Sequence, residues 1–314
     1  MKNSNVIITG INGFVGQNLK TYLKEDYKLT GISRNAKSDE LTFDFFLREN
    51  NIYDAVIHLA GMAHDLRNFH SPLEYYKVNF ELTMQVFDEF IKSDAEVFIY
   101  VSSVKSIGDE FNGVLNESAI PNPKTHYGIS KLLAENYIMK HKIPEKKRIY
   151  VLRPCMIHGP GNKGNLNLLY NFVSKGLPWP LGSFENSRSF LSVENLCFVI
   201  NEILQNKEIP SGIYNLADDC PFSTIELIKL IGISKNKKVI ILRIPRFIIR
   251  WIARIFELVG SSFDNNRLSK LTDSCVVSNK KIMSYIGKNL PISAAEGFRR
   301  TFNSFNEREN LLIK

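Results

Sequence analysis

The sequence predicts an α/β protein in which a doubly wound parallel sheet is followed by a smaller C-terminal α/β lobe. Apolar runs in the N-terminal half are continuous rather than alternating, as in strands that are covered on both faces. These runs alternate with segments of helical periodicity, which indicates parallel strands joined by helical crossovers. After about residue 155, Gly and Pro become frequent and short strands mix with helices, which is typical of a lobe built on the edge of such a sheet.

The expected elements follow one another in a regular order. They are strand 6–9, helix 14–24, strand 28–32, strand 55–60, helix 72–92, strand 97–101, helix 127–141 and strand 149–152. We expect a first domain over residues 1–160, to which segments of about 188–220 return, and a substrate lobe over 161–314. Right-handed crossovers bring the carboxyl ends of all parallel strands to one edge, where ligands bind.

Composition excludes several classes of protein. Hydrophobic residues make up 44% and charged residues 23% of the 314 residues, as in ordinary globular proteins. No apolar run approaches the ~18 residues of a membrane span, and the run at 6–8 is too short for a signal peptide. The net charge of +8 comes without basic clusters interleaved with aromatic residues, so we expect no nucleic acid partner. The four cysteines lack metal-ligand spacing, which favours a reducing, cytoplasmic location: Cys155, Cys197, Cys220 and Cys275.

Three glycines lie where the first strand ends and the first helix begins. Gly10 permits a tight turn, Gly13 lets the backbone approach a pyrophosphate, and Gly16 permits close packing of helix on sheet. The following helix N-terminus offers free N–H groups and the positive end of its dipole. The spacing is GxxGxxG, and glycines also collect in turns that bind nothing, but the position directly after an apolar strand predicts a Rossmann-type dinucleotide site.

The end of the second strand bears on the choice between NAD and NADP. A site selective for NAD places an acidic side chain there, on the ribose hydroxyls, whereas this strand ends in Ser33-Arg34 with no acid. Arg34 could pair with the 2′-phosphate of NADP, so the sequence favours NADP(H), with NAD as the alternative. An exposed loop arginine without a ligand is the other interpretation. Asp44 could accept a hydrogen bond from the adenine amine.

Tyr127 and Lys131 stand four residues apart and therefore share one face of the expected helix. We expect the neighbouring cation to lower the pKa of the tyrosine, as a general acid/base for a sugar hydroxyl or ketone requires. A Tyr-x-x-x-Lys pair alone is common on protein surfaces. Here, Ser102-Ser103 ends another apolar strand at the same edge of the sheet, and a hydroxyl there could hold the reacting oxygen beside the phenol.

The combined pattern resembles the extended short-chain dehydrogenase/reductase family, in particular its NAD-dependent epimerase/dehydratase group of UDP-hexose 4-epimerases and nucleotide-sugar 4-reductases. The resemblance covers nearly the whole chain. Beyond the residues above, it rests on His58-Leu59-Ala60-Gly61, Asn79, Arg153-Pro154, Gly159-Pro160-Gly161, Arg188-Ser189-Phe190-Leu191-Ser192-Val193-Glu194-Asn195-Leu196 and Gly212-Ile213-Tyr214-Asn215-Leu216.

The resemblance implies roles for individual residues. Tyr127 would be the acid/base, Lys131 would bind the nicotinamide ribose, and Ser103 would orient the substrate oxygen. The implied cofactor contacts are Gly10, Gly13, Phe14, Val15, Gly16, Ser33, Arg34, Asp44, Leu59, Ala60, Gly61, Asn79, Ser102, Tyr127, Lys131 and Pro154. The implied substrate contacts are Ser103, Lys105, Asn165 and Arg188, of which the last two would meet the nucleotide diphosphate. No metal site is implied.

Three departures from the family pattern leave the catalytic residues unchanged, and the first of them removes an aromatic wall of the sugar pocket. Ser106-Ile107-Gly108 replaces a Val-Tyr-Gly segment, His158 stands where many relatives have tyrosine, and the stretch 80–83 lacks a common glycine. In addition, the Asp-Glu pair of dehydratases does not follow Ser103. Dehydration is therefore disfavoured.

Two reactions share this machinery. A 4-ketoreductase delivers one hydride from NADPH, whereas a UDP-hexose 4-epimerase oxidises its substrate and returns the hydride from a retained cofactor. Arg34 and the missing acid narrowly favour the reductase, acting on a UDP-linked N-acetylated, 6-deoxy hexose in surface-polysaccharide synthesis. A cofactor-sensing regulator without catalysis is disfavoured because Tyr127 and Lys131 are both present. The resemblance also implies a homodimer formed through helices 72–92 and 127–141.

Residues 247–259 predict an amphipathic helix with arginines at every turn, counting Arg246, Arg250 and Arg254. It could lie at a membrane surface or contact a partner, but the favoured interpretation is a lobe helix with its apolar face buried and its arginines in water. His64 and His70 share a loop that holds no cluster of carboxylates or cysteines, so we expect surface or pocket-lining histidines there.

Overall fold

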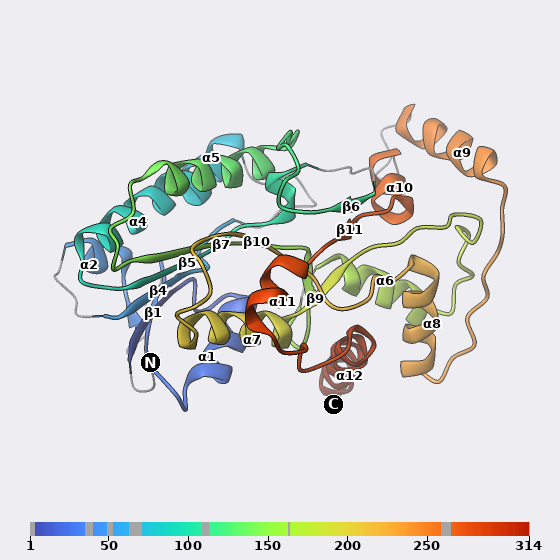
Figure 1. The fold of residues 1–314 in the computed structure, drawn as a ribbon. Helices are drawn as coiled ribbons and strands as arrows, with labels where there is room; N and C mark the ends of the chain where they lie inside the picture. The colour runs from blue at the N-terminus through green and yellow to red at the C-terminus, as the bar shows by residue number, and fades with distance from the viewer. Residues whose placement is uncertain are drawn as a thin grey trace.

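A seven-stranded, wholly parallel sheet forms the centre of the protein (Figure 1). The computed structural model describes residues 4–34, 40–48, 53–62, 71–108, 113–162, 164–258 and 265–313. The strand order is β10-β7-β5-β4-β1-β2-β3. Their bounds are β1 Asn5–Thr9, β2 Lys28–Ile32, β3 Glu40–Leu41, β4 Ala55–His58, β5 Val97–Val101, β7 Arg148–Pro154 and β10 Gly212–Leu216. The expected Rossmann-type α/β fold is confirmed.

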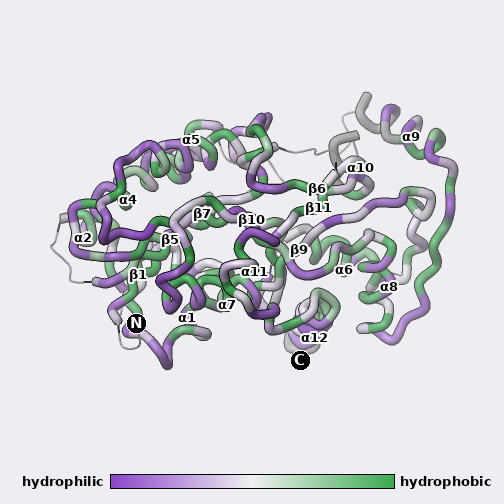
Figure 2. The backbone as a smooth tube through the Cα atoms, viewed as in Figure 1, coloured by the Kyte–Doolittle hydropathy of each residue, from purple (hydrophilic) through white to green (hydrophobic). Residues whose placement is uncertain are grey.

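Helices cover both faces of the sheet (Figure 1). Side chains alternate along each strand, so Val6 and Ile8 join one apolar cluster while Ile7 joins the other. The first cluster includes residues from α1 (Phe14–Leu23), α7 (Val193–Gln205) and α11 (Lys280–Ile286). The second includes residues from α2 (Phe43–Arg48), α4 (Leu82–Lys92) and α5 (His126–Lys140). Burial on both sides explains why strands such as β1 read as continuous apolar runs, where green predominates in Figure 2.

The expected single helix over 72–92 is divided in three. It consists of α3 (Pro72–Tyr76), a π-helical turn η1 (Lys77–Glu81) and α4. A capping box between Ser71 and Glu74 begins it. The π turn carries Asn79, which is fully buried toward the carboxyl edge of the sheet. Such turns inside α-helices often occur at functional sites.

The C-terminal lobe has its own apolar cluster, rich in aromatic residues. Its elements are α6 (Asn165–Ser174), α8 (Thr224–Ser234), α9 (Arg246–Leu258), α10 (Asn265–Thr272) and α12 (Ala294–Ile313). Two short parallel pairs lie near the sheet: β6 (Val114–Leu115) with β11 (Val276–Val277), and β8 (Met156–His158) with β9 (Phe190–Ser192). Residues 193–216 return to the first domain. Helix α7 packs on α1, and β10 extends the central sheet beside β7.

Within the residues described, no helix combines the length and the apolar character needed to cross a bilayer. The four cysteines are free thiols; Cys155 and Cys197 are buried.

Candidate active site

The glycine loop packs directly against the end of β4. Gly10 has φ +71°, and a Cβ there would lie 2.8 Å from the backbone nitrogen of Ala60. A Cβ on Gly16 would lie 2.5 Å from the Gly10 carbonyl oxygen. Gly13 is the N-cap of α1 and provides no side-chain cap, so the helix start is left to backbone N–H groups. This cradle, which side chains would fill, fits a dinucleotide pyrophosphate. Phe14 and Val15 lie half-buried in the first turn of α1.

A buried histidine holds the β4 turn in place. The Nδ1 atom of His58 lies 2.7 Å from the Thr9 hydroxyl, and its Nε2 lies 2.9 Å from the Thr83 hydroxyl. The Thr9 hydroxyl also accepts a hydrogen bond from Ala60 N, at 3.1 Å. Burial, assisted by the charge of Lys131, lowers the pKa of His58 to about 3. The ring is therefore neutral and serves to brace the strand end from which Leu59, Ala60 and Gly61 follow.

Asn79 anchors the backbone just beyond this turn. Its Oδ1 accepts from Met62 N at 2.7 Å, and its Nδ2 donates to the Met62 carbonyl and to Ser130 Oγ, both at 3.1 Å. Gly61 is exposed beside it, and a Cβ there would lie 3.2 Å from the Lys131 ammonium nitrogen. The structure thus brings the β4 turn and Lys131 together, while the side chain of Asn79 is used in positioning the turn.

The structure also brings Ser103, Tyr127 and Lys131 together at the carboxyl edge of β5. Gly128 permits this, because a Cβ there would lie 2.4 Å from the Lys105 carbonyl oxygen, so α5 begins against the turn that follows Ser103. Thr125 caps α5 by accepting from Gly128 N at 3.2 Å. Tyr127 and Ser103 are both half-buried and hydrogen-bond through their side chains. A hydroxyl pair in this position can bind and deprotonate one substrate oxygen.

The expected effect of Lys131 on Tyr127 is wrong for this structure. Burial raises the pKa of Tyr127, and the hydrogen bond from Ser103 opposes that rise. Lys131 is not among the groups that shift this pKa. The ammonium instead donates to the Val101 carbonyl at 3.1 Å and lies 4.8 Å from the centre of the Tyr100 ring. Its burial lowers the pKa of Lys131 to about 8, against the opposing charge of Glu135. The spacing on one helix face was predicted, but not which atoms the cation meets.

A buried ion pair beneath these residues escaped the sequence analysis. Arg153 of β7 donates to both carboxylate oxygens of Glu135, with Nη2 at 2.5 Å from Oε2, and both side chains are almost fully buried. Ser102 donates its hydroxyl to the same carboxylate. Its side chain is thus hydrogen-bonded in the interior, because Ser102 and Ser103 are successive residues of an extended chain and point opposite ways. The spacing of Glu135, four residues after Lys131, was the available signal.

A carboxylate does reach the end of β2, contrary to the expectation from the sequence. Glu40, the first residue of β3, accepts from Ser33 Oγ at 2.7 Å and from Asn12 Nδ2 of the glycine loop at 2.8 Å. The parallel pairing of β3 with β2 places it there, because Ser33 N also donates to the Leu41 carbonyl. The acid is thus contributed by the neighbouring strand rather than by β2 itself. Arg34 and Asp44 have exposed side chains.

Two of the expected substrate contacts, Arg188 and Lys105, carry charges that act on the same cysteine. Burial raises the pKa of Cys275, and the positive charges of Arg188 and Lys105 oppose that rise, so both cations lie near this thiol. Backbone bonds between Arg188 and Phe222, and a bridge to Cys275, fix the strand that carries Arg188. Asn165 begins α6, and its side chain lies outside the described residues, as do His64 and His70.

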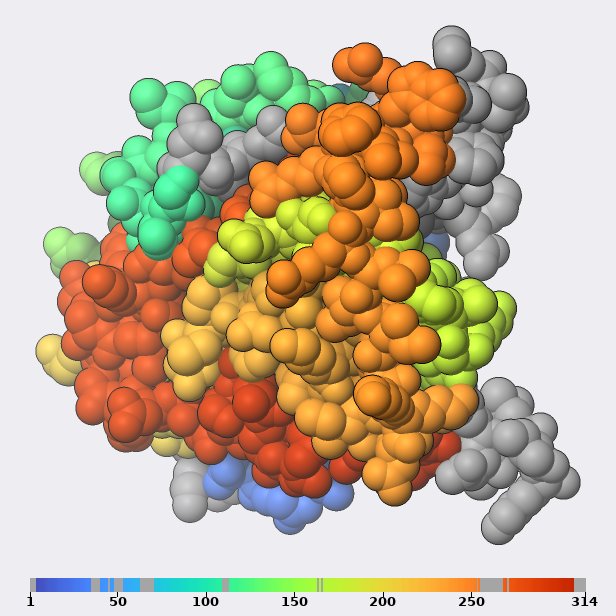
Figure 3. All heavy atoms as spheres, turned by 90° about the vertical axis from the view of Figure 1, so that its right-hand side faces the viewer, coloured from blue at the N-terminus to red at the C-terminus, as the bar shows by residue number. Residues whose placement is uncertain are grey.

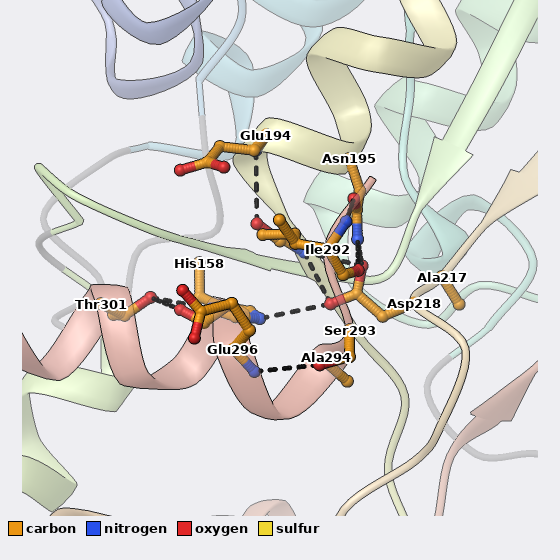
Figure 4. Close-up of polar contacts among 12 residues, drawn as sticks. His158, Glu194, Asn195, Ala217, Asp218, Ile292, Ser293, Ala294, Glu296 and Thr301 are labelled. Carbon is orange, nitrogen blue, oxygen red and sulfur yellow. Dashed lines mark hydrogen bonds and ion pairs between the residues drawn. The ribbon is translucent and has the colours of Figure 1, made fainter. Parts of the chain in front are cut away.

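His158 connects the C-terminal helix to the edge of the nucleotide-binding fold (Figure 4). Its Nδ1 lies 2.9 Å from the Thr301 hydroxyl of α12, its Nε2 lies 3.6 Å from the Asp218 carboxylate, and its ring stacks on Phe298 at 4.2 Å. Asp218 also accepts from Asn195 Nδ2 at 2.7 Å. His158 is fully buried, and its contacts join α12 to the chain that follows β10. Pro154, at the end of β7, is likewise buried.

Comparison with protein families identifies the group to which these features belong. The model of the NAD dependent epimerase/dehydratase family matches residues 6–217. The chain belongs to this family. As an extended short-chain dehydrogenase/reductase it is an NAD(P)-dependent enzyme, and the retained Ser103, Tyr127 and Lys131 agree with that class.

Individual relatives differ in the reaction named for them. A UDP-glucose 4-epimerase of Vibrio cholerae is 30% identical over 328 residues, which cover 97% of this chain and 96% of the relative. An N-acetyl-α-D-glucosaminyl-diphospho-ditrans,octacis-undecaprenol 4-epimerase of Escherichia coli O157:H7 is 28% identical over 77% of this chain and 76% of its own. The structure of RMD from Pseudomonas aeruginosa complexed with NADPH has a TM-score of 0.73 at 22% identity and covers 98% of this chain and 100% of its own. The enzyme therefore acts with a nicotinamide cofactor in the nucleotide-sugar epimerase, reductase and dehydratase group.

Proposed function

We propose that the chain is an NAD-dependent 4-epimerase of a hexose carried on a diphosphate. The observation that carries the proposal is the Glu40 carboxylate beside Ser33 and Asn12. An acid at the end of β2 accepts hydrogen bonds from the adenosine ribose hydroxyls and repels the 2′-phosphate of NADP. A cofactor that is regenerated in every turnover suits a redox-neutral epimerisation, whereas a consumed reductant is usually NADPH.

In this proposal, the residues of α5 and β5 handle the substrate proton. When bound, the nicotinamide cofactor supplies the acceptor and then the donor of the hydride at carbon 4. Tyr127 removes the proton from the 4-hydroxyl as the carbonyl forms and returns it when the carbonyl is reduced from its other face. Ser103 holds the same oxygen beside the phenol, and Lys131 holds the nicotinamide ribose next to Gly61.

The carrier of the sugar is proposed from charge. Lys105 and Arg188 supply two cations near Cys275, where a diphosphate would be held. The relatives named above act on a UDP-linked sugar in one case and on an undecaprenyl-diphosphate-linked sugar in the other, and both carriers present a diphosphate. We propose a UDP-linked hexose, glucose or its N-acetylamino analogue, as the substrate.

A 4-ketoreductase that consumes NADPH is the second candidate. The exposed Arg34 favours it, because the guanidinium could turn to a 2′-phosphate. The similarity to a structure complexed with NADPH supports the same possibility. In that case Tyr127 donates one proton to the reduced carbonyl and the substrate is a 4-keto sugar.

The test measures cofactor and reaction separately. Mass spectrometry of the denatured protein identifies any retained dinucleotide, and titration compares NAD(H) with NADP(H). We expect retained or preferred NAD, conversion of UDP-glucose or UDP-N-acetylglucosamine to its 4-epimer without added reductant, and a shift toward NADP in Glu40→Gln. In Arg34→Gln the preference should stay unchanged. Preference for NADPH that disappears in Arg34→Gln would instead establish the reductase.

We also propose a homodimer formed through the outer faces of α4 and α5. Leu133 and Met139 of α5 are 37% and 39% exposed, respectively. Light scattering should give twice the chain mass for the native enzyme and a lower mass for Leu133→Lys.

A further inference from the structure

Helix α9 turns a mixed aromatic and basic face to solvent. Phe247 and Trp251 are 73% and 65% exposed, and the arginines at 246, 250 and 254 are exposed beside them. We call these five residues the aromatic–arginine face. The opposite side holds Ile249, which is 5% exposed and packs in the lobe core. The favoured expectation from sequence is therefore corrected in part: the arginines do face water, but two large aromatic rings face it with them.

The position of α9 leaves this face accessible in the single chain. The helix lies at the outer rim of the lobe, far from the central sheet (Figure 1). The orange segment that contains it stands at the surface in the upper part of Figure 3. Arg246 is fixed by donating to the Ser183 carbonyl at 2.7 Å and lies 5.7 Å from the Phe184 ring centre. One end of the face is thus attached rigidly to the lobe.

The side chains of this face have complementary preferences at a bilayer surface. Aromatic rings favour the boundary between headgroups and acyl chains, and guanidinium groups form paired hydrogen bonds with phosphates. No acidic residue occurs from Arg246 to Arg254, so the face is uniformly cationic. An exposed Phe or Trp side chain forgoes the favourable free energy of burial, and here two such side chains are exposed one helical turn apart.

We propose that the aromatic–arginine face docks the enzyme on an anionic lipid bilayer, with α9 lying in the plane of the interface. Its 13 residues span about 20 Å, which is shorter than the hydrocarbon core. A second copy of the chain is disfavoured as the occupant, because a two-fold contact through this face would bring the arginines of both copies together. The proposal does not depend on which reaction the active site performs.

Vesicle flotation of the full chain tests the proposal. We expect binding to vesicles that contain phosphatidylglycerol, no binding to pure phosphatidylcholine, and release by high salt. Fluorescence reports on the face directly, since the chain has two tryptophans and Trp179 is buried at 5% exposure. The emission of Trp251 should shift to the blue on binding and be quenched by brominated lipids.

Variants distinguish binding through the aromatic–arginine face from non-specific hydrophobic adsorption to vesicles. Phe247→Ser with Trp251→Ser, and separately Arg250→Gln with Arg254→Gln, should each weaken vesicle binding about tenfold or more while dinucleotide binding stays unchanged. The matched control replaces Leu73 and Ile120, 77% and 89% exposed elsewhere, with Ser and should bind as the native protein does. Equal vesicle binding by all variants would overturn the proposal. The proposal would also be overturned if the native protein did not bind vesicles, or if a dimer of the native protein dissociated in the Phe247→Ser, Trp251→Ser variant.

Discussion

Lowering the pH from about 7.5 to about 5 should destabilise the fold through His58. The ring is fully buried and neutral, with burial lowering its pKa to about 3. Its hydrogen bonds also define the tautomer. Thr83 donates its hydroxyl to the Asn79 carbonyl at 2.9 Å and so accepts from His58 Nε2, which leaves Nδ1 to accept from the Thr9 hydroxyl. A second ring proton would face a donor.

The magnitude follows from the two pKa values. In the unfolded chain the imidazole has a pKa near 6.5, and in the folded chain about 3, so between these values the unfolded state binds more protons. Stability is complete above pH 6.5 and is lost as the pH falls toward 3. At about pH 5 the loss is ~2 kcal/mol, and the whole separation corresponds to ~5 kcal/mol. The pKa of Lys131, about 8, lies above this window, so that group is protonated throughout it.

Urea unfolding followed by circular dichroism measures the effect, provided that the transition is reversible. His58→Gln should be less stable than the native chain at about pH 7.5, because two buried hydrogen bonds change. Its unfolding free energy should nevertheless fall by ~2 kcal/mol less between about pH 7.5 and pH 5. His126→Gln replaces an exposed histidine and should keep the native slope. Equal slopes in His58→Gln and the native chain would refute a neutral His58.

Three further predictions concern Lys131 and the residues close to it. Glu135→Gln leaves buried Arg153 without its charged partner and should lower the unfolding free energy by about 3 kcal/mol, measured by denaturant titration. Gly61→Ala places a Cβ 3.0 Å from Asn79 Oδ1 and 3.2 Å from the Lys131 ammonium, and calorimetry should show dinucleotide affinity reduced roughly tenfold with little change in stability. Dinucleotide affinity of the native enzyme should fall as the pH rises through about 8, where Lys131 loses its proton, and Lys131→Gln should bind weakly without that pH dependence. Native dinucleotide affinity in Gly61→Ala would contradict the predicted clash at Gly61. A dinucleotide affinity of the native enzyme that does not change with pH would contradict the role given to the Lys131 charge.

The fold could be predicted because the signal for each strand is local. A strand buried on both faces must be apolar at every position, and Val97–Val101 shows this without any knowledge of its neighbours. The glycine loop at residues 10, 13 and 16 could be predicted for the same reason, because a turn in which a Cβ would clash accepts few residues other than glycine. The helix with Tyr127 and Lys131 follows from one period of 3.6 residues. The residues that we propose to be catalytic were thus predicted from short-range spacing together with the family resemblance.

Pairings between strands were not predictable in the same way. Glu40 belongs to a two-residue strand seven positions after Ser33, and only the register of β3 on β2 brings the two side chains together. The end of β2 itself has no acid, and from the sequence alone the expected cofactor site therefore lacked one. Glu135 and Arg153 likewise lie on a helix and a strand 18 residues apart, and a charged pair in the interior runs against the usual preference for exposed charges. Such groups have to be found from tertiary contacts.

One face of the α5 helix carries three functional groups at increasing depth. Tyr127, Lys131 and Glu135 follow one another at intervals of four residues, and their exposure falls from half-buried to 4% and then 1%. The phenol remains at the surface where a substrate oxygen can reach it. The ammonium lies one turn deeper, against Gly61 and the Val101 carbonyl, and the carboxylate another turn deeper, where Arg153 and Ser102 fix it. Because each deeper group is held by more of the protein, the helix would hold the phenol in one geometry for the catalytic role that we propose for it.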